Sequence, residues 1–295
     1  MYVTKNGSAS VSVINQLTGA ITATIDVGAS PRGLAYCPTN NSLYVANYGT
    51  TTVSVINAAT NTVTATITVG SHPAAIAYCP DNDKMYVTNF SSASVSVIDP
   101  VTHGVIAVIA VGSDPGDSCG IAYCPINNNM YVVNQGGDVA RAIDSSTNTV
   151  VATIIETPGP PGDGPTVWDG SPVVDGGAGI TYCPTNGMFY IANRNTAVVL
   201  VMDPSLNTMV ATIMGVVSPF GIAFNPSNGK IYITNVNYSL VSVINPATNN
   251  VIGAVDAYGL AGVGVGLSPR EIAYCPTTQK MYVASASSNS VAVLT

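Results

Sequence analysis

The sequence predicts an all-β fold, a β-propeller of seven blades, and three observations support this. A phrase that opens with tyrosine recurs along the whole chain. Three of its six spacings are identical, and the other three are longer. Each unit contains four short strand-like segments, and a period of roughly 40–45 residues with four strands is typical of one propeller blade. The tyrosines that open the phrase are Tyr2, Tyr44, Tyr86, Tyr131, Tyr190, Tyr232 and Tyr282.

The second repeat illustrates the four strands expected in each blade. Residues 33–37 form a short apolar segment that a glycine opens, which fits an innermost strand A. Strand B follows at 43–47 and strand C at 53–57, where polar and apolar residues alternate as in a half-buried strand. Residues 63–69 alternate more strictly, as expected for the exposed outer strand D.

The repeat covers residues 1–295, which predicts a single propeller domain with loop insertions at 156–178 and 257–270. The repeats begin near residues 1, 43, 85, 130, 189, 231 and 281. The pattern contains six A strands, seven B strands, seven C strands and six D strands, so the first and last blades are expected to be incomplete. An unpaired strand edge accepts another strand. Two alternatives stay open: strands supplied by a neighbouring subunit or a longer parent chain, giving self-association through the incomplete blade edges, or blades that pack with three strands.

Charge is scarce in this chain and limits the classes of partner. Only 8% of the residues are charged, the net charge is -7, and there are eight Lys and Arg in total. Nucleic acids and anionic membranes need clustered Lys and Arg, so neither is expected as a partner. Every apolar run is shorter than the span of about 18 residues that a transmembrane helix needs, which excludes membrane insertion by a helix. Because Met1 leads straight into a predicted strand, we expect no signal peptide in this chain. A Thr-, Ser- and Asn-rich surface favours an extracellular or cell-surface location.

Five of the six cysteines occupy one place in the repeat, directly before proline, and we expect them to be buried and reduced. Equivalent positions in neighbouring blades are further apart than the roughly 7 Å between Cα atoms that a disulfide allows. The polar residue that ends strand C is expected to cap the following turn, and we expect the same of the Asn that ends strand B. The five cysteines are Cys37, Cys79, Cys124, Cys183 and Cys275.

The phrase itself resembles a known family. Residues 85–89 read Met-Tyr-Val-Thr-Asn and residues 94–99 read Ser-Val-Ser-Val-Ile-Asp. Both are similar to the YVTN-type β-propeller repeat of archaeal surface-layer proteins and bacterial surface proteins. This resemblance implies seven blades and a surface location. No catalytic residue of the related lactonase and quinoprotein-type propellers matches a position here.

Departures from the repeat indicate where function is added. Three loops that enter strand A are enlarged, at 112–119, 156–178 and 257–270. Strands alternate in direction within a blade, so these loops and the loops between strands B and C are expected at one face. Aromatic and arginine side chains at that face predict a site for a protein or glycan. The alternative is that the long loops only cover the end of the fold. The candidate binding residues are Tyr48, Phe90, Trp168, Arg194 and Tyr238.

Residues suited to a metal or to catalysis are few. Asp163, Asp169 and Asp175 provide oxygen ligands for Ca²⁺ in a Gly-rich loop, although their spacing is not that of an EF-hand. No other cofactor is expected, and the two histidines, His72 and His103, fall at opposite ends of a blade. The sequence therefore favours a non-catalytic surface module for binding or assembly, in a surface layer or adhesin. A lactonase-like hydrolase that acts at the loop-rich face and a virion surface protein are the alternatives.

Overall fold

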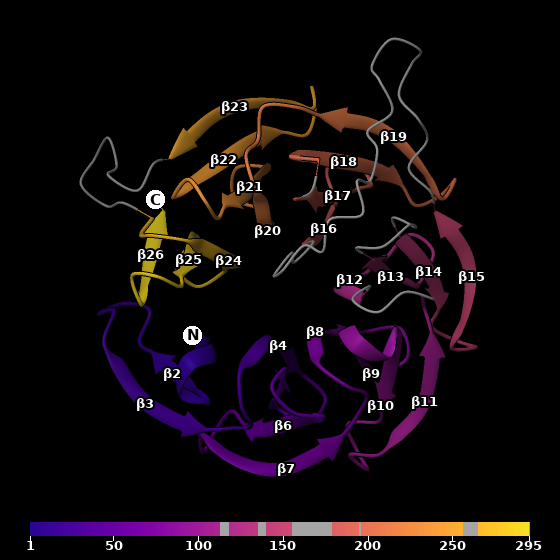
Figure 1. Cartoon of the computed structure of the whole chain (residues 1–295), viewed down its shortest axis with the longest axis vertical. Helices are drawn as coiled ribbons and strands as arrows, with labels where there is room; N and C mark the ends of the chain where they lie inside the picture. Colours follow the sequence, from indigo (N-terminus) through magenta and orange to yellow (C-terminus); the bar gives the residue numbers. More distant parts are fainter. Residues whose placement is uncertain (113–117, 135–139, 155–178, 195, 256–264, 295) are drawn as a thin grey trace. The chain divides into compact units, whose positions relative to one another are not determined.

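The computed structural model describes residues 1–112, 118–134, 140–154, 179–194, 196–255 and 265–294. The chain divides into two compact units, unit 1 (Met1–Thr153) and unit 2 (Ile154–Thr295). Each unit consists of antiparallel sheets that follow one another along the chain, and Figure 1 traces them from indigo to yellow. The prediction of a single domain for 1–295 stays a prediction.

Unit 1 holds the first four blades. Blade 1 contains β1 (Tyr2–Lys5), β2 (Ser10–Ile14) and β3 (Ile21–Asp26). Blade 2 contains β4 (Pro31–Cys37), β5 (Ser42–Asn47), β6 (Thr52–Asn57) and β7 (Thr62–Thr68). Blade 3 contains β8 (Pro73–Cys79), β9 (Lys84–Asn89), β10 (Ser94–Ile98) and β11 (Val105–Ala110). Blade 4 contains β12 (Ser118–Tyr123), β13 (Asn129–Asn134), β14 (Ala140–Asp144) and β15 (Thr149–Ile154).

Unit 2 holds the last three blades. Blade 5 contains β16 (Ile180–Cys183), β17 (Met188–Asn193), β18 (Val198–Asp203) and β19 (Thr208–Ile213). Blade 6 contains β20 (Pro219–Asn225), β21 (Lys230–Asn235), β22 (Leu240–Asn245) and β23 (Asn250–Val255). Blade 7 contains β24 (Pro269–Cys275), β25 (Lys280–Ser285) and β26 (Ser290–Leu294).

The fold is a β-propeller of seven blades, as the repeat predicts. In each four-stranded sheet the strands pair in sequence order, from A to D, and blades 1 and 7 have three strands each. Blade 1 lacks strand A and blade 7 lacks strand D among the described residues, as expected. The only helices in the described ranges are two three-residue 3-10 turns, η1 (Asn6–Ser8) and η2 (Phe90–Ser92). None of the described helices has the length and apolarity to cross a membrane.

Burial follows the position of each strand in its blade. β5 is buried along its whole length, whereas β7, a strand D, alternates between exposed and covered residues. The first strands of successive blades pack together, as β4 and β8 do in unit 1, while β7 and β11 lie at the far edges of their sheets (Figure 1). This confirms the assignment of the outer strand from its strict alternation.

Close approach of neighbouring A strands explains the glycine that opens strand A. A Cβ atom on Gly33 would lie 2.6 Å from the Ala74 carbonyl oxygen of the next blade. In unit 2, a Cβ on Gly179 would lie 2.6 Å from the Phe220 carbonyl oxygen. No side chain fits at these distances, so glycine lets two backbones pack directly.

The cysteine prediction is confirmed. Cys37, Cys79, Cys124, Cys183 and Cys275 are buried and free of disulfides. Burial raises the pKa of the Cys79 and Cys124 thiols, which keeps these two protonated at neutral pH.

The prediction that the polar residue at the end of strand C caps the following turn is confirmed as well. Asn57 Oδ1 accepts the backbone N–H groups of Ala59 and Thr60 at 2.9 and 3.1 Å. In blade 4, hydrogen bonds from the Ser146 hydroxyl and the Thr147 N–H lower the pKa of the Asp144 carboxyl. These polar residues are therefore structural turn caps.

Candidate binding surface

Within a blade, the loop that enters strand A and the loop between strands B and C are hydrogen-bonded to each other. The Tyr48 N–H donates to the Ser30 carbonyl at 3.1 Å, and the Phe90 N–H donates to the His72 carbonyl at 3.0 Å. Ser30 and His72 have φ angles of 50° and 53°, so each turns its carbonyl toward the neighbouring loop. This confirms that the two kinds of loop share one end of the blade.

Three aromatic rings meet at this end of blades 2 and 3. The Tyr48 ring centroid lies 5.0 Å from that of His72 and 5.9 Å from that of Phe90, and the Tyr48 and Phe90 rings are inclined at 60° in an edge-to-face arrangement. Edge-to-face pairs at such distances are favourable beyond the area that they bury. The sequence predicted Tyr48 and Phe90 for this surface, and the structure brings them together, with His72 as a member that the sequence argument left out.

Arg32 completes this group, because its guanidinium carbon lies 3.4 Å from the centre of the Tyr48 ring. A cation over a tyrosine face is attracted by the negative face of the ring. We call Arg32, Tyr48, His72 and Phe90 the aromatic cluster. Each of the four is partly or fully exposed, so the cluster presents flat apolar faces next to a positive charge. Such a surface suits a ligand with both apolar faces and hydrogen-bond acceptors.

The other predicted binding residues belong to other parts of the chain. Arg194 is half-buried directly after β17, and Tyr238 lies in the loop after β21 with 60% of its surface exposed. Both are in unit 2. Trp168 lies outside the described residues, as do Asp163, Asp169 and Asp175, the candidate Ca²⁺ ligands.

Few side chains in the described ranges are placed for acid–base catalysis or metal binding. No group of three or more His, Cys, Asp or Glu side chains is placed to hold a metal ion there. His72 faces Tyr48, whereas His103 lies in the C-to-D turn of blade 3, where its Nδ1 is 3.3 Å from the Tyr44 hydroxyl. The two histidines are thus at different ends of a blade, as expected.

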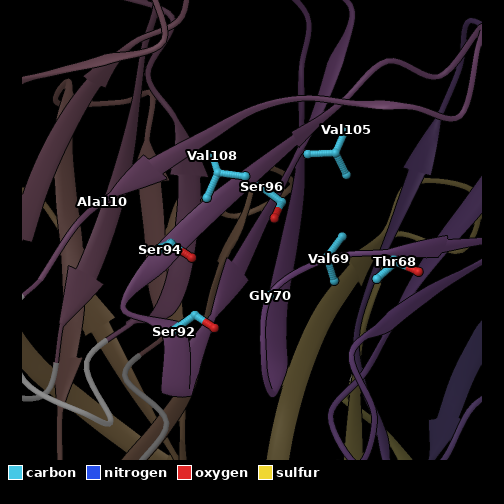
Figure 2. Close-up of a pocket in the computed structure, with 9 residues that line it drawn as sticks. All are labelled: Thr68, Val69, Gly70, Ser92, Ser94, Ser96, Val105, Val108 and Ala110. Carbon is cyan, nitrogen blue, oxygen red and sulfur yellow. The ribbon is translucent and has the colours of Figure 1, made fainter.

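A groove of about 530 Å³ runs between the last strand of blade 2 and the outer strands of blade 3 (Figure 2). Its lining consists of hydroxyl, aliphatic and glycine residues, with no ionisable side chain: Thr68, Val69, Gly70, Ser92, Ser94, Ser96, Val105, Val108 and Ala110. The groove therefore offers shape and weak hydrogen bonding, and no general acid or base.

The Asn that ends strand B caps its own turn in blade 5, where Asn193 Oδ1 accepts the Thr196 N–H at 3.3 Å, but it behaves differently from the prediction in blades 2 and 3. Asn47 Nδ2 donates to Ser54 Oγ at 3.0 Å, and Asn89 Nδ2 donates to Ser96 Oγ at 2.9 Å. These buried amides therefore cross to strand C, and the expectation of a local turn cap is wrong for them. The reason is packing: a Cβ on Gly70 would lie 2.7 Å from Asn89 Cγ, so the adjoining loop presses the amide into the sheet.

A repeated contact that the sequence argument missed joins several neighbouring blades. The Tyr86 hydroxyl accepts from Asn82 Nδ2 at 2.8 Å and donates to Asn148 Oδ1 at 2.7 Å in the turn of blade 4. In unit 2, Tyr190 makes the same contacts with Asn186 and Asn249 at 2.9 and 2.7 Å. Burial raises the pKa of Tyr86 and Tyr190 to about 12. The signal was present in the sequence, as an Asn four residues before the tyrosine.

Comparisons with known proteins identify the fold only. No protein-family model matches the chain, and no curated protein matches it. Among solved structures, the chain is similar to a Kuenenia stuttgartiensis hydrazine synthase chain, with 18% sequence identity and a TM-score of 0.77. The match covers 99% of this chain and 91% of that chain. At this identity the likeness supports a β-propeller fold and carries no activity with it.

Proposed function

We propose that this chain is a non-catalytic binding and assembly module of an extracellular or cell-surface structure, and that the aromatic cluster is its recognition site. The cluster is the observation that carries this proposal: two aromatic rings, an imidazole and a guanidinium gather where two blades expose their loops. Binding energy at interfaces concentrates in aromatic and arginine side chains on a rigid support. The partner class is a protein or a glycan.

Several features support a non-catalytic role. Within the described residues the ionisable side chains are dispersed, and the groove beside blade 3 has none in its lining. The surface location rests on the resemblance to YVTN-type repeats and on the low fraction of charged residues, 8%. A surface-layer or adhesin component fits these features, and a virion surface protein fits the same composition.

A printed array of neutral and acidic oligosaccharides tests the site directly. We expect the wild-type protein to retain at least one glycan class, and Tyr48→Ala combined with Phe90→Ala to lower that binding at least tenfold, because both stacking rings are lost. Tyr36→Ala is the matched control, since Tyr36 is also an exposed tyrosine of blade 2, at 48% exposure, but lies in β4 beyond the cluster.

Equal binding by the double variant and the wild type would contradict the assignment of the site. A wild-type protein that retains no glycan would contradict the glycan class and leave a protein as the partner, which the same three proteins test against purified surface proteins immobilised on a sensor.

A propeller enzyme, such as a lactonase-like hydrolase, is the second candidate. Its support is the likeness in fold to a chain of hydrazine synthase, an enzyme by name. Ring opening of simple lactones, measured by pH-stat with and without Ca²⁺, tests it. Turnover that tracks the purified protein and persists through further purification would favour the enzyme over the binding module.

A further inference from the structure

β1 is a strand B with one edge that has no partner among the described residues. In the other blades strand B lies between strands A and C, whereas β1 pairs only with β2. The equivalent strand β5 is buried along its length, but Tyr2, Val3 and Thr4 are half-buried and Lys5 is exposed. A row of backbone donors and acceptors along β1 is therefore open to another strand.

Thr4 indicates which kind of strand fits this edge. Equivalent threonines occur in two other blades, Thr88 and Thr234. In both of these blades the pairing of strands A and B contains a register shift, which takes one residue of strand A out of the ladder. The N–H of that residue donates to the threonine hydroxyl instead: Ala75 to Thr88 Oγ1 at 2.9 Å, and Gly221 to Thr234 Oγ1 at 2.8 Å.

Thr4 makes only the hydrogen bond that joins this hydroxyl to the next blade. Its hydroxyl donates to the Arg32 carbonyl of the next blade at 2.9 Å, as the Thr234 hydroxyl does to the Arg270 carbonyl. No N–H of the described residues donates to the Thr4 hydroxyl. The remaining blades have alanine or valine at this position: Ala46, Val133, Ala192 and Ala284. Blade 1 thus carries the hydroxyl that receives strand A, although the described part of its sheet contains no strand A.

We propose that β1 is a docking site for an extended polypeptide segment with the strand A pattern, Pro-x-Gly-Ile-Ala followed by Tyr or Phe, supplied by a partner chain. The register of β20 on β21 sets its position: the Ala of the segment lies opposite Tyr2, the Ile opposite Val3 and the Pro opposite Lys5. The Gly N–H of the segment donates to Thr4 Oγ1, and strand addition supplies the remaining backbone hydrogen bonds.

A small residue at the glycine position of the segment is a specificity requirement. In blade 6, a Cβ on Gly221 would collide with the Arg270 carbonyl of the next blade. The Arg32 carbonyl holds the equivalent place beside Thr4, since both carbonyls accept the threonine hydroxyl. A residue larger than alanine at this position is excluded by the same contact, whereas alanine is found there in blade 3, as Ala75.

A fluorescein-labelled peptide with the sequence of residues 217–226, which contains the strand A of blade 6, serves as the probe. We expect saturable binding in fluorescence anisotropy and a 1:1 complex in native mass spectrometry. Thr4→Val keeps the shape of the side chain and removes the hydroxyl, so it lowers the affinity about five- to tenfold, the loss expected for one hydrogen bond. Thr66→Val, at an exposed position of β7, is the matched control and leaves the affinity unchanged.

A second peptide, with an ester in place of the amide between its Phe and Gly, lacks only the N–H that is assigned to Thr4. It binds the wild-type protein about five- to tenfold more weakly and binds Thr4→Val with no further loss, because both changes remove the same hydrogen bond. Independent losses in this double-mutant cycle would overturn the register. A peptide with valine in place of the glycine does not bind.

Hydrogen exchange of the dilute protein alone tests whether the edge is open. The amides of β1 that β2 leaves unpaired exchange rapidly before the peptide is added and become protected when it binds. Protection of these amides in the free protein, equal to that of β5, would show that the edge is already filled and would overturn the proposal. Absence of saturable binding to the folded wild-type protein would also overturn it.

Discussion

The junction between blades 5 and 6 and the junction between blades 6 and 7 are alike at the A strands and differ at the strand B tyrosine. At both junctions a glycine of strand A packs against a backbone carbonyl of the next blade, Gly179 against Phe220 and Gly221 against Arg270. Tyr190 reaches the C-to-D turn of blade 6, but Tyr232 meets no such turn in the described part of blade 7, whose sheet ends at strand C.

The result of this difference is visible in burial. Tyr190 is fully buried, whereas Tyr232 is half-buried, although both accept a hydrogen bond from the Asn four residues earlier at 2.9 Å. The full burial of Tyr190 therefore depends on the turn of the neighbouring blade.

The largest expected effect comes from adding a side chain where a strand A glycine packs against the next blade. Gly221→Val places a side chain against the backbone of β24 and should lower the free energy of unfolding by about 3 kcal/mol. Gly253→Val is the matched control, because a Cβ at Gly253 in β23 meets no atom within 4 Å. Chemical denaturation compares the two. A similar stability for both variants would mean that the A strands do not require glycine.

A smaller effect separates the two tyrosines. Tyr190→Phe removes a hydroxyl that joins Asn186 to Asn249, leaves both amides short of a partner, and should destabilise by about 2 kcal/mol. Tyr232→Phe removes a hydroxyl outside such a junction and should change stability by less than about 0.5 kcal/mol. Denaturation midpoints at neutral pH measure both. Equal losses would contradict the view that the next blade provides the burial.

The smallest effect concerns the turn caps of blades 5 and 6, which are Asp203 and Asn245 at equivalent positions. The Ser205 hydroxyl and N–H lower the pKa of the Asp203 carboxyl, so its contribution is present at neutral pH and decreases as the pH falls through the lowered pKa. Asp203→Asn introduces the residue that blade 6 has at this position. It should change the free energy of unfolding by less than about 0.5 kcal/mol at pH 7, and below about pH 4 the variant should lose less stability than the wild type. Thermal denaturation from acidic to neutral pH tests this. If the stability of the variant depended on pH as that of the wild type does, Asp203 would not contribute to the loss of stability in acid.

Much of the fold followed from local pattern. The alternation of residues 63–69 identified an outer strand, the glycine at Gly33 identified a strand that packs closely against its neighbour, and Asn57 was recognised as a turn cap. Each of these depends on the conformation of a few neighbouring residues, which the sequence records directly.

The candidate site was predictable only in part. Tyr48 and Phe90 were found because aromatic residues stand out in a short loop, whereas Arg32 and His72 belong to other segments and enter the cluster through folding. The amide of Asn89 was assigned to its own turn because the glycine that presses on it, Gly70, lies in a different loop, before strand A of the same blade.

The sequence by itself determined the number of blades, the order of strands and the two incomplete sheets, because a repeated pattern of turns and alternating side chains specifies each blade independently. Only the tertiary structure decided what happens between blades. There the Tyr86 hydroxyl meets Asn148, and the Thr4 hydroxyl meets the Arg32 carbonyl. Contacts of this kind join residues 28 to 62 positions apart, and their geometry depends on how two finished sheets pack, which no local pattern encodes.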